Sequence, residues 1–273
     1  MTFLQSIILG IIQGITEFLP ISSSAHLVLV PFFFNWNLDE QVVFPFDVLV
    51  QLGTLVAVVV YFWKDIWQIL VGCWKALRTR SLKDNEPARL GLLVVLATIP
   101  AGIFGLLIKD QVEAAFHSAL AVGIFLLVTA ILLFLAEWLG KRTRNLSKLG
   151  WLDAILIGLA QALAIFPGVS RSGSTISAGM LRHLERPAAA RFSFLMSIPI
   201  FVAAGVLSIG DLVAIPNFTS FLPILAAGFI AAAVVGYLSI HWLLSFLNRH
   251  SFKGFAIYCV VLGLLTIGVY AIR

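Results

Sequence analysis

Charged residues are scarce in this chain. They make up 11% of the 273 residues, about half the share usual in soluble domains, while 60% of the residues are hydrophobic and the mean hydropathy is +1.04. This balance excludes an ordinary soluble globular domain and predicts an all-α integral membrane protein. The net charge of +5 is therefore no sign of a nucleic-acid partner, and we expect none.

Cysteine is almost absent, and so are basic residues near the start of the chain. Cys73 and Cys259 lie far apart in apolar stretches and belong to no metal-ligand spacing, so we interpret them as packing residues. The first lysine or arginine is Lys64, which leaves no basic segment of the kind that opens a cleavable signal peptide.

Six apolar segments are long enough to cross a bilayer, which needs about 20 residues of helix. Two further apolar regions, 3–34 and 151–184, are interrupted by proline and by clusters of serine and glycine. We interpret each of these as a re-entrant pair of half-helices, because broken backbone is tolerated at membrane depth only inside protein or beside water. The six predicted spans are 45–63, 91–108, 118–139, 189–209, 221–247 and 254–272.

The basic residues support this plan. If neither broken region crosses the membrane, the segments 64–90, 141–150, 182–191 and 249–253 lie on one side, and they hold 15 of the 18 lysines and arginines. That side should be cytoplasmic, with both chain termini facing outward.

The two broken regions resemble each other. Gln13, Phe18 and Pro20 of the first align, with one gap, with Gln161, Phe166 and Pro167 of the second, and a serine cluster follows each. Each region precedes three spans, so the halves 1–140 and 150–273 should have inverted orientations. Inverted repeats with broken helices place a site near the midplane, where we expect the two tips to meet.

The second tip, 167–175, predicts an anion site. Two glycines permit tight turns, a helix N-terminus offers free N–H groups, and the Arg171 guanidinium matches a phosphate with two parallel hydrogen bonds. The alternative is a structural hairpin in which Arg171 pairs with Glu17. The candidate binding residues beside Arg171 are Ser170, Ser172, Gly173, Ser174 and Thr175.

The first tip carries a candidate nucleophile. Gln13 and Glu17 share a helix face, Ser22 can cap the next helix, and Ser23 and His26 are spaced so that their side chains can meet. A hydroxyl within reach of an imidazole is the arrangement of an activated nucleophile. Glu17 could orient His26, hold a cation or activate water.

The remaining polar residues give weaker indications. On the first span, Asp47, Gln51 and Thr54 either line the cavity or form hydrogen bonds between helices. Ser193 and Ser197 hold a comparable place in the second half. The other histidines are interpreted as interfacial; they are His117, His183, His241 and His250.

Both tips resemble the signature segments of the bacterial undecaprenyl-diphosphate phosphatase family, also called the bacitracin-resistance protein family. The resemblance covers nearly the whole chain and includes 46–53 and 252–258. It implies hydrolysis of undecaprenyl diphosphate to the monophosphate and inorganic phosphate, which recycles the carrier for peptidoglycan synthesis and confers bacitracin resistance. The family's functional residues map to Glu17, Ser23, His26, Ser170, Arg171, Ser172 and Thr175.

The resemblance also implies a location in the bacterial plasma (inner) membrane, with the site facing the periplasm or cell exterior. It implies a divalent cation, Mg²⁺ or Ca²⁺, near Glu17. Here Gln13 replaces a carboxylate that many relatives carry, which thins the cation site, and Ala25 replaces a frequent glycine. A homodimer is left open.

Three routes for phosphoryl transfer stay open: attack by Ser23, attack by His26, or attack by water with Glu17 as base. The main rival function is a transporter, most sharply a lipid flippase, because inverted repeats and a midplane anion site also describe carriers. A carrier, however, needs no nucleophile beside a base. A structural scaffold would leave Glu17 and Arg171 unexplained.

Overall fold

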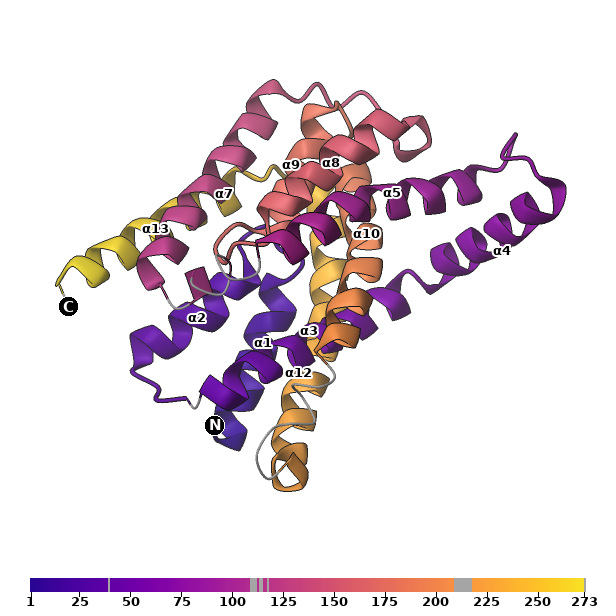
Figure 1. The fold of residues 1–273 in the computed structure, drawn as a ribbon. Coiled ribbons are helices and arrows are strands. Elements are labelled where there is room, and N and C mark those ends of the chain that lie inside the picture. Colours follow the sequence, from indigo (N-terminus) through magenta and orange to yellow (C-terminus); the bar gives the residue numbers. More distant parts are fainter. Residues whose placement is uncertain (39, 109–111, 113–114, 117, 209–217, 273) are drawn as a thin grey trace.

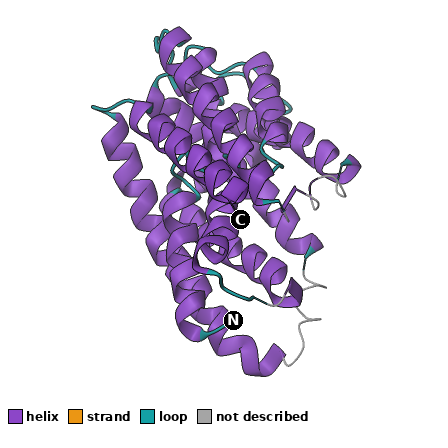
Figure 2. Cartoon of the chain, turned by 90° about the vertical axis from the view of Figure 1, so that its left-hand side faces the viewer, coloured by secondary structure: helices purple, strands orange, loops and turns teal. Residues whose placement is uncertain are grey.

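Long apolar runs become helices here because lipid offers no partners for backbone N–H and C=O groups. The computed structural model describes the chain except residues 39, 109–111, 113–114, 117, 209–217 and 273, and its described elements are all helical (Figures 1 and 2). The elements are α1 (Phe3–Thr16), α2 (Ser23–Phe34), α3 (Glu40–Tyr61), α4 (Trp63–Thr79), α5 (Glu86–Leu107), α7 (Ala119–Leu139), η1 (Leu146–Lys148), α8 (Trp151–Leu163), α9 (Arg171–Leu181), α10 (Arg186–Leu207), α12 (Phe218–Leu247) and α13 (Lys253–Ile272).

Six of the described helices are long and apolar enough to cross a membrane, in agreement with the six predicted spans. They are α3, α5, α7, α10, α12 and α13. The broken regions form α1–α2 and α8–α9, pairs of shorter helices that fall outside this set. The chain is a multi-pass membrane protein. His117 lies outside the described residues.

One expectation is corrected. The basic segment 64–90 was predicted as a connection between spans, but its first part is the helix α4, which begins directly after α3, and α5 starts before the predicted residue 91. Figure 1 shows α4 and the first part of α5 projecting together from one edge of the bundle. Apolar residues recur every three to four positions within α4, a spacing that predicts a helix, but the basic residues between them obscured this pattern.

The α8–α9 hairpin closes on itself. Asp153, at the start of α8, accepts a 2.7 Å hydrogen bond from Arg182 at the end of α9 and another from Arg144. Burial of Asp153 raises its pKa, but the hydrogen bonds from Arg144 and Arg182 outweigh this effect and hold the pKa at about 2. The hairpin therefore returns to the side from which it started.

The four basic segments contact one another on that side. Glu137 accepts hydrogen bonds from Arg142, Arg186 and the backbone N–H of Phe252, which ties the end of α7 to the starts of α10 and α13. Arg89 donates to the carbonyl of Ser147, which adds the start of α5. These contacts bring part of each basic segment to one end of the bundle.

The α1–α2 hairpin starts at the other end of the bundle. Ser6 of α1 donates to the carbonyl of Ile224, near the beginning of α12, whereas the end of α12 approaches the basic segments. Gly10 lets α1 touch the backbone of α12, since a Cβ there would lie 2.3 Å from the Gly228 carbonyl oxygen. The start of α1 thus lies at the end of α12 that is away from the basic segments.

Candidate functional site

Glu17 is the centre of a buried hydrogen-bond network at the end of α1. Its side chain is 5% exposed. One carboxylate oxygen, Oε1, accepts a 2.8 Å bond from Arg171; the other, Oε2, accepts from Gln13 at 2.9 Å and from Ser23 at 2.6 Å. Gln13 also approaches the Thr54 hydroxyl on α3 at 3.5 Å. The pairing of Arg171 with Glu17, which the sequence offered as the structural alternative to an anion site, is therefore present, and it brings the two tips into contact.

Arg171 opens α9, and its guanidinium connects three elements. Besides Glu17 of the first hairpin, it donates to the carbonyl of Ser193 on α10 at 3.0 Å and lies 5.0 Å from the ring centre of Phe201. Thr175, one turn later on α9, meets the Ser193 hydroxyl at 2.7 Å. An aromatic face and a backbone carbonyl fix the guanidinium plane, so its orientation is set before a ligand arrives.

The turn before α9 is anchored to α7. Gly168 adopts a φ of 103°, which favours glycine, and its carbonyl accepts a 2.9 Å bond from the Thr129 hydroxyl. The same hydroxyl accepts a 2.9 Å bond from the backbone N–H of Ser170. Ser170 then caps α9 by accepting from the Gly173 N–H, and its hydroxyl lies 3.2 Å from that of Ser172.

The tips are also joined through backbone. Ser172 donates to the carbonyl of Leu19 at 3.1 Å, and Phe18 packs edge-to-face on Phe194 with ring centres 5.2 Å apart. Ser22 caps α2 from a backbone with a φ of 68°, accepting from the Ala25 N–H at 3.3 Å. The spacing in sequence between the two capping serines, Ser22 and Ser170, equals the spacing between Gln13 and Gln161. An alignment of the two hairpins without a gap therefore matches both the glutamines and the helix caps.

His26 is buried but faces away from Ser23. Its Nδ1 lies 2.7 Å from the Ser22 carbonyl, and its Nε2 lies 2.7 Å from the Tyr258 hydroxyl on α13. The described hydrogen bonds contain no contact between His26 and Ser23, whose hydroxyl donates to Glu17 instead. The expected serine–histidine pair is thus replaced by a serine–carboxylate pair, because the capping turn at Ser22 takes up one ring nitrogen.

The predicted residues divide into two groups. Gln13, Glu17, Ser23, Arg171, Thr175 and Thr54 belong to one connected network, with Ser170 and Ser172 at its edge and His26 one turn away. Ser174 is buried on another face of α9 and has no hydrogen-bond partner among the described residues, nor have the side-chain amide of Gln161 and the hydroxyl of Ser177. Asp47 and Gln51 lie on the same side of α3 as Thr54, but nearer the start of the helix.

Three further residues position the site, although the sequence alone did not assign them a role in it. Tyr258 positions the His26 ring, Thr129 holds the second tip, and Ser193 bonds both Arg171 and Thr175. Thr129 is the only threonine in α7, a long apolar span, which is a weak signal of a polar partner. Tyr258 ends the segment 252–258 that carries part of the resemblance, but its partner His26 lies far away in the sequence, so no role could be assigned to it.

The residues present do not form a divalent-cation site by themselves. Glu17 is the one carboxylate that the described hydrogen bonds place in this network, and both of its oxygens accept from donors, one of them a guanidinium. Within the described ranges, no group of three histidine, cysteine, aspartate or glutamate side chains could hold a metal ion. Mg²⁺ and Ca²⁺ require about six or more oxygen ligands, so the protein alone supplies too few.

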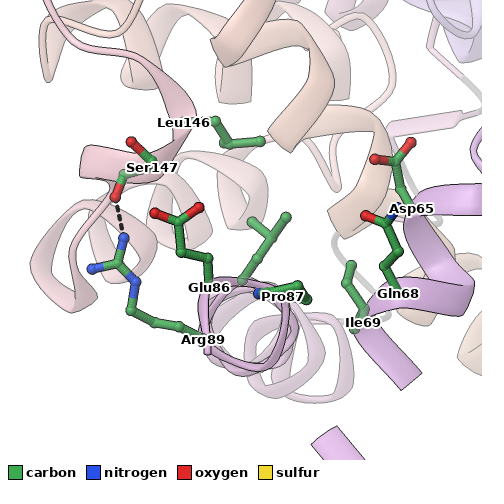
Figure 3. A pocket seen from close by; sticks show the side chains of 9 residues that line it. Asp65, Gln68, Ile69, Glu86, Pro87, Arg89, Leu146 and Ser147 are labelled. Carbon is green, nitrogen blue, oxygen red and sulfur yellow. Dashed lines mark hydrogen bonds between the residues drawn. The ribbon is translucent and has the colours of Figure 1, made fainter. Parts of the chain in front are cut away.

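A separate hollow lies on the basic side of the molecule. A cavity of about 180 Å³ is lined by Asp65 and Gln68 of α4, by Glu86 and Arg89 of α5, and by the turn at Ser147 (Figure 3). Asp65 is paired with Arg191 and Arg89 with the Ser147 carbonyl. None of the network around Glu17 reaches this cavity.

Comparison with known proteins gives the family. The model of the bacitracin resistance protein BacA family matches residues 6–265. The chain belongs to this family. Curated relatives named undecaprenyl-diphosphatase are 43% identical in Moorella thermoacetica and 44% identical in Gemmatimonas aurantiaca, each over 273 residues and the full length of both chains. A relative of the same name in Pelotomaculum thermopropionicum is 44% identical over 100% of this chain and 98% of its own.

Membership in the BacA family agrees with the resemblance that the two tips carry in the sequence. The matched range contains α8–α9, all of α1–α2 except the first three residues of α1, the network around Glu17, and Tyr258 on α13. The family therefore covers each element that positions the site.

Replacing Thr129 with valine should loosen the second tip. Valine has a similar shape but leaves the Ser170 N–H and the Gly168 carbonyl without their buried partner, at a cost of about 1–3 kcal/mol. We expect a lower midpoint of thermal unfolding in detergent for Thr129→Val. The matched control is Thr98→Val on α5, whose hydroxyl bonds only the carbonyl one turn earlier. Equal midpoints for the two variants would contradict the anchoring role of Thr129.

Proposed function

We propose that the protein is a membrane phosphatase that hydrolyses undecaprenyl diphosphate to undecaprenyl phosphate and inorganic phosphate. The observation that carries the proposal is the Ser23 hydroxyl bonded to a buried carboxylate that also meets Arg171. The names of the relatives, undecaprenyl-diphosphatase, support the substrate. The activity would recycle the lipid carrier for peptidoglycan synthesis and confer bacitracin resistance.

In the proposed reaction, the terminal phosphate of the lipid takes the place of Glu17 on Arg171. The guanidinium neutralises charge on the phosphoryl oxygens, and the free N–H groups at the starts of α2 and α9 add partial positive charge. Ser170, Ser172 and Thr175 carry hydroxyls at the cap and in the first two turns of α9, and they would orient the phosphate.

Ser23 then attacks the terminal phosphorus while its proton passes to Glu17. The bond from phosphorus to the bridging oxygen breaks, and undecaprenyl phosphate leaves with that oxygen. Glu17 passes the Ser23 proton to the departing phosphate and becomes a carboxylate again. Water then hydrolyses the phosphoserine: Glu17 takes a proton from the water and returns it to the Ser23 oxygen, and inorganic phosphate is released. The 2.6 Å bond from Ser23 to Glu17 favours this route over attack by His26, whose two ring nitrogens are both engaged.

His26 is given an assisting role in this proposal. Its position next to the capping turn lets the imidazole hold the Ser22 carbonyl and so fix the backbone that presents Ser23. Tyr258 keeps the ring oriented from the opposite side. Direct attack by water with Glu17 as base needs the same residues except the Ser23 hydroxyl, so a Ser23 variant separates the two routes.

A divalent cation is proposed to arrive with the substrate. Because Glu17 alone supplies too few ligands, Mg²⁺ or Ca²⁺ would depend on oxygens of the lipid diphosphate, with Glu17 as the protein ligand. Bound in this way, the cation would neutralise phosphate charge. Replacement of the usual carboxylate by Gln13 fits such a shared site.

We also propose a re-entrant, inverted arrangement of the halves 1–140 and 150–273 in the bacterial plasma (inner) membrane. Its support is the entry of the two hairpins from opposite ends, the meeting of their tips at Glu17 and Arg171, and the closed base of α8–α9 at Asp153 and Arg182. With the basic side in the cytoplasm, the site would face the periplasm or cell exterior. A homodimer would leave this site complete in each chain.

Phosphate release from a C55 prenyl diphosphate by the purified protein tests the proposed reaction. Ser23→Ala and Glu17→Gln should lower the rate by about 10²–10⁴-fold through loss of the nucleophile or its base. Arg171→Lys should lose most activity, because lysine cannot make the paired contact. His26→Ala should lose less than Ser23→Ala.

The matched controls are Ser147→Ala, Arg249→Lys and His250→Ala, all exposed and distant from the network, and each should keep the wild-type rate. A Ser23→Ala variant with more than a tenth of wild-type activity would exclude covalent catalysis and favour water attack. Wild-type protein that is folded and binds the lipid but releases no phosphate would instead indicate a lipid carrier.

Removal of divalent cations should stop phosphate release, and Mg²⁺ or Ca²⁺ should restore it. In isothermal titration, the lipid-free protein should show no tight cation binding, and the protein with a non-hydrolysable diphosphate lipid should bind one cation. Glu17→Ala should abolish this second signal. Turnover that is unchanged in EDTA would rule out the cation while leaving the Ser23 route intact.

A further inference from the structure

The outer face of α4 carries an apolar ridge with no partner among the described residues. Its members recur at alternating intervals of four and three residues, so they line up along one side of the helix. Each is more than half exposed. The ridge consists of Trp63, Trp67, Leu70, Trp74 and Leu77.

The opposite face of α4 already has a packing partner. Gly72 is buried against α5, where an added Cβ would lie 2.9 Å from the backbone nitrogen of Ala88, and Gly91 of α5 fits against Ile69 and Cys73. Hence α4 is fixed to the protein by one face, and the ridge points away from it. A different environment must cover the ridge.

A flank of one charge sign borders the ridge. Lys64, Lys75 and Arg78 are separated by eleven and three residues, which places them on the same side of α4, and all three are exposed. The Arg78 guanidinium lies 6.0 Å from the ring centre of Trp74, so charge and ridge are contiguous. The one acidic residue of α4, Asp65, lines the cavity on the basic side (Figure 3). It pairs with Arg191.

The position of α4 relative to the spans is also defined. It has 17 residues, falls outside the helices long and apolar enough to cross, and starts directly after α3 at the end where the basic segments gather. A helix with tryptophans on one side and lysines and arginines beside them is typical of the membrane interface. The ridge suits acyl chains, and the flank suits lipid phosphates.

We propose that α4 is an interfacial helix that binds anionic phospholipids in the leaflet on the basic side of the protein. The ridge lies among the acyl chains, and the flank of Lys64, Lys75 and Arg78 contacts the negatively charged headgroups. The charge of the flank selects a lipid surface over a second copy of this chain, since two copies would bring like charges together. The proposal does not depend on the phosphatase activity.

Spin-labelled lipids in proteoliposomes measure this selectivity. The ratio of the association constants for phosphatidylglycerol and phosphatidylcholine is determined from the immobilised lipid fraction for the wild type and for Lys64→Gln/Lys75→Gln/Arg78→Gln. Because each basic residue near an anionic surface contributes to binding, the ratio should fall at least about threefold in the triple variant. The preference of the wild type should also weaken in high salt.

The matched control is Lys141→Gln/Arg249→Gln/Lys253→Gln, which removes the same charge from the same side but away from α4. It should keep the wild-type lipid preference. An equal fall in both triple variants, or no fall in either, would overturn the proposal.

A spin label at Leu77→Cys, in a chain with both native cysteines replaced by alanine, tests the occupant of the ridge. The proposal expects strong relaxation by oxygen and a depth at the boundary of headgroups and acyl chains. Dipolar broadening from a second label at short range would show a protein dimer on this face and overturn the proposal, even if the charge variants failed to fold.

Discussion

The salt bridge between Glu17 and Arg171 joins two hairpins that lie far apart in the sequence. Both groups are buried, and the loss of either partner would leave an unpaired charge, at a cost of about 3–5 kcal/mol. The bond therefore fixes the two tips against each other. It also holds the nucleophile candidate Ser23 and the guanidinium of Arg171 on opposite oxygens of one carboxylate.

The surrounding residues that the structure describes hold this salt bridge in place, but they do not satisfy every hydrogen-bond donor of Arg171. Thr129 and Ser193 fix the second tip from α7 and α10, while Tyr258 and the Ser22 turn fix the first from α13 and α2. Arg171 nevertheless retains a buried Nε with no partner among the described residues. A phosphate that replaces Glu17 on Arg171 would meet donors already held in position, which is the condition for electrostatic catalysis.

Much of this arrangement could be predicted from sequence. Six spans, two broken regions and a basic side follow from hydropathy and charge, and the buried Glu17 and Arg171 stand out because charge is costly in a membrane. The pairing of Ser23 could not be predicted. Helical spacing suggested His26, but the left-handed turn at Ser22 directs the Ser23 hydroxyl toward α1. Tyr258 and α4 were missed because each depends on a distant packing partner or on a period masked by basic residues.

Titration calorimetry with inorganic phosphate tests whether phosphate and Glu17 compete for Arg171. Glu17→Gln should bind phosphate several-fold more tightly than the wild type, because the competing carboxylate charge is gone and the guanidinium is free. Arg171→Lys should bind phosphate more weakly. Equal affinity in Glu17→Gln and the wild type, or weaker binding in Glu17→Gln, would show that phosphate and Glu17 do not compete for Arg171.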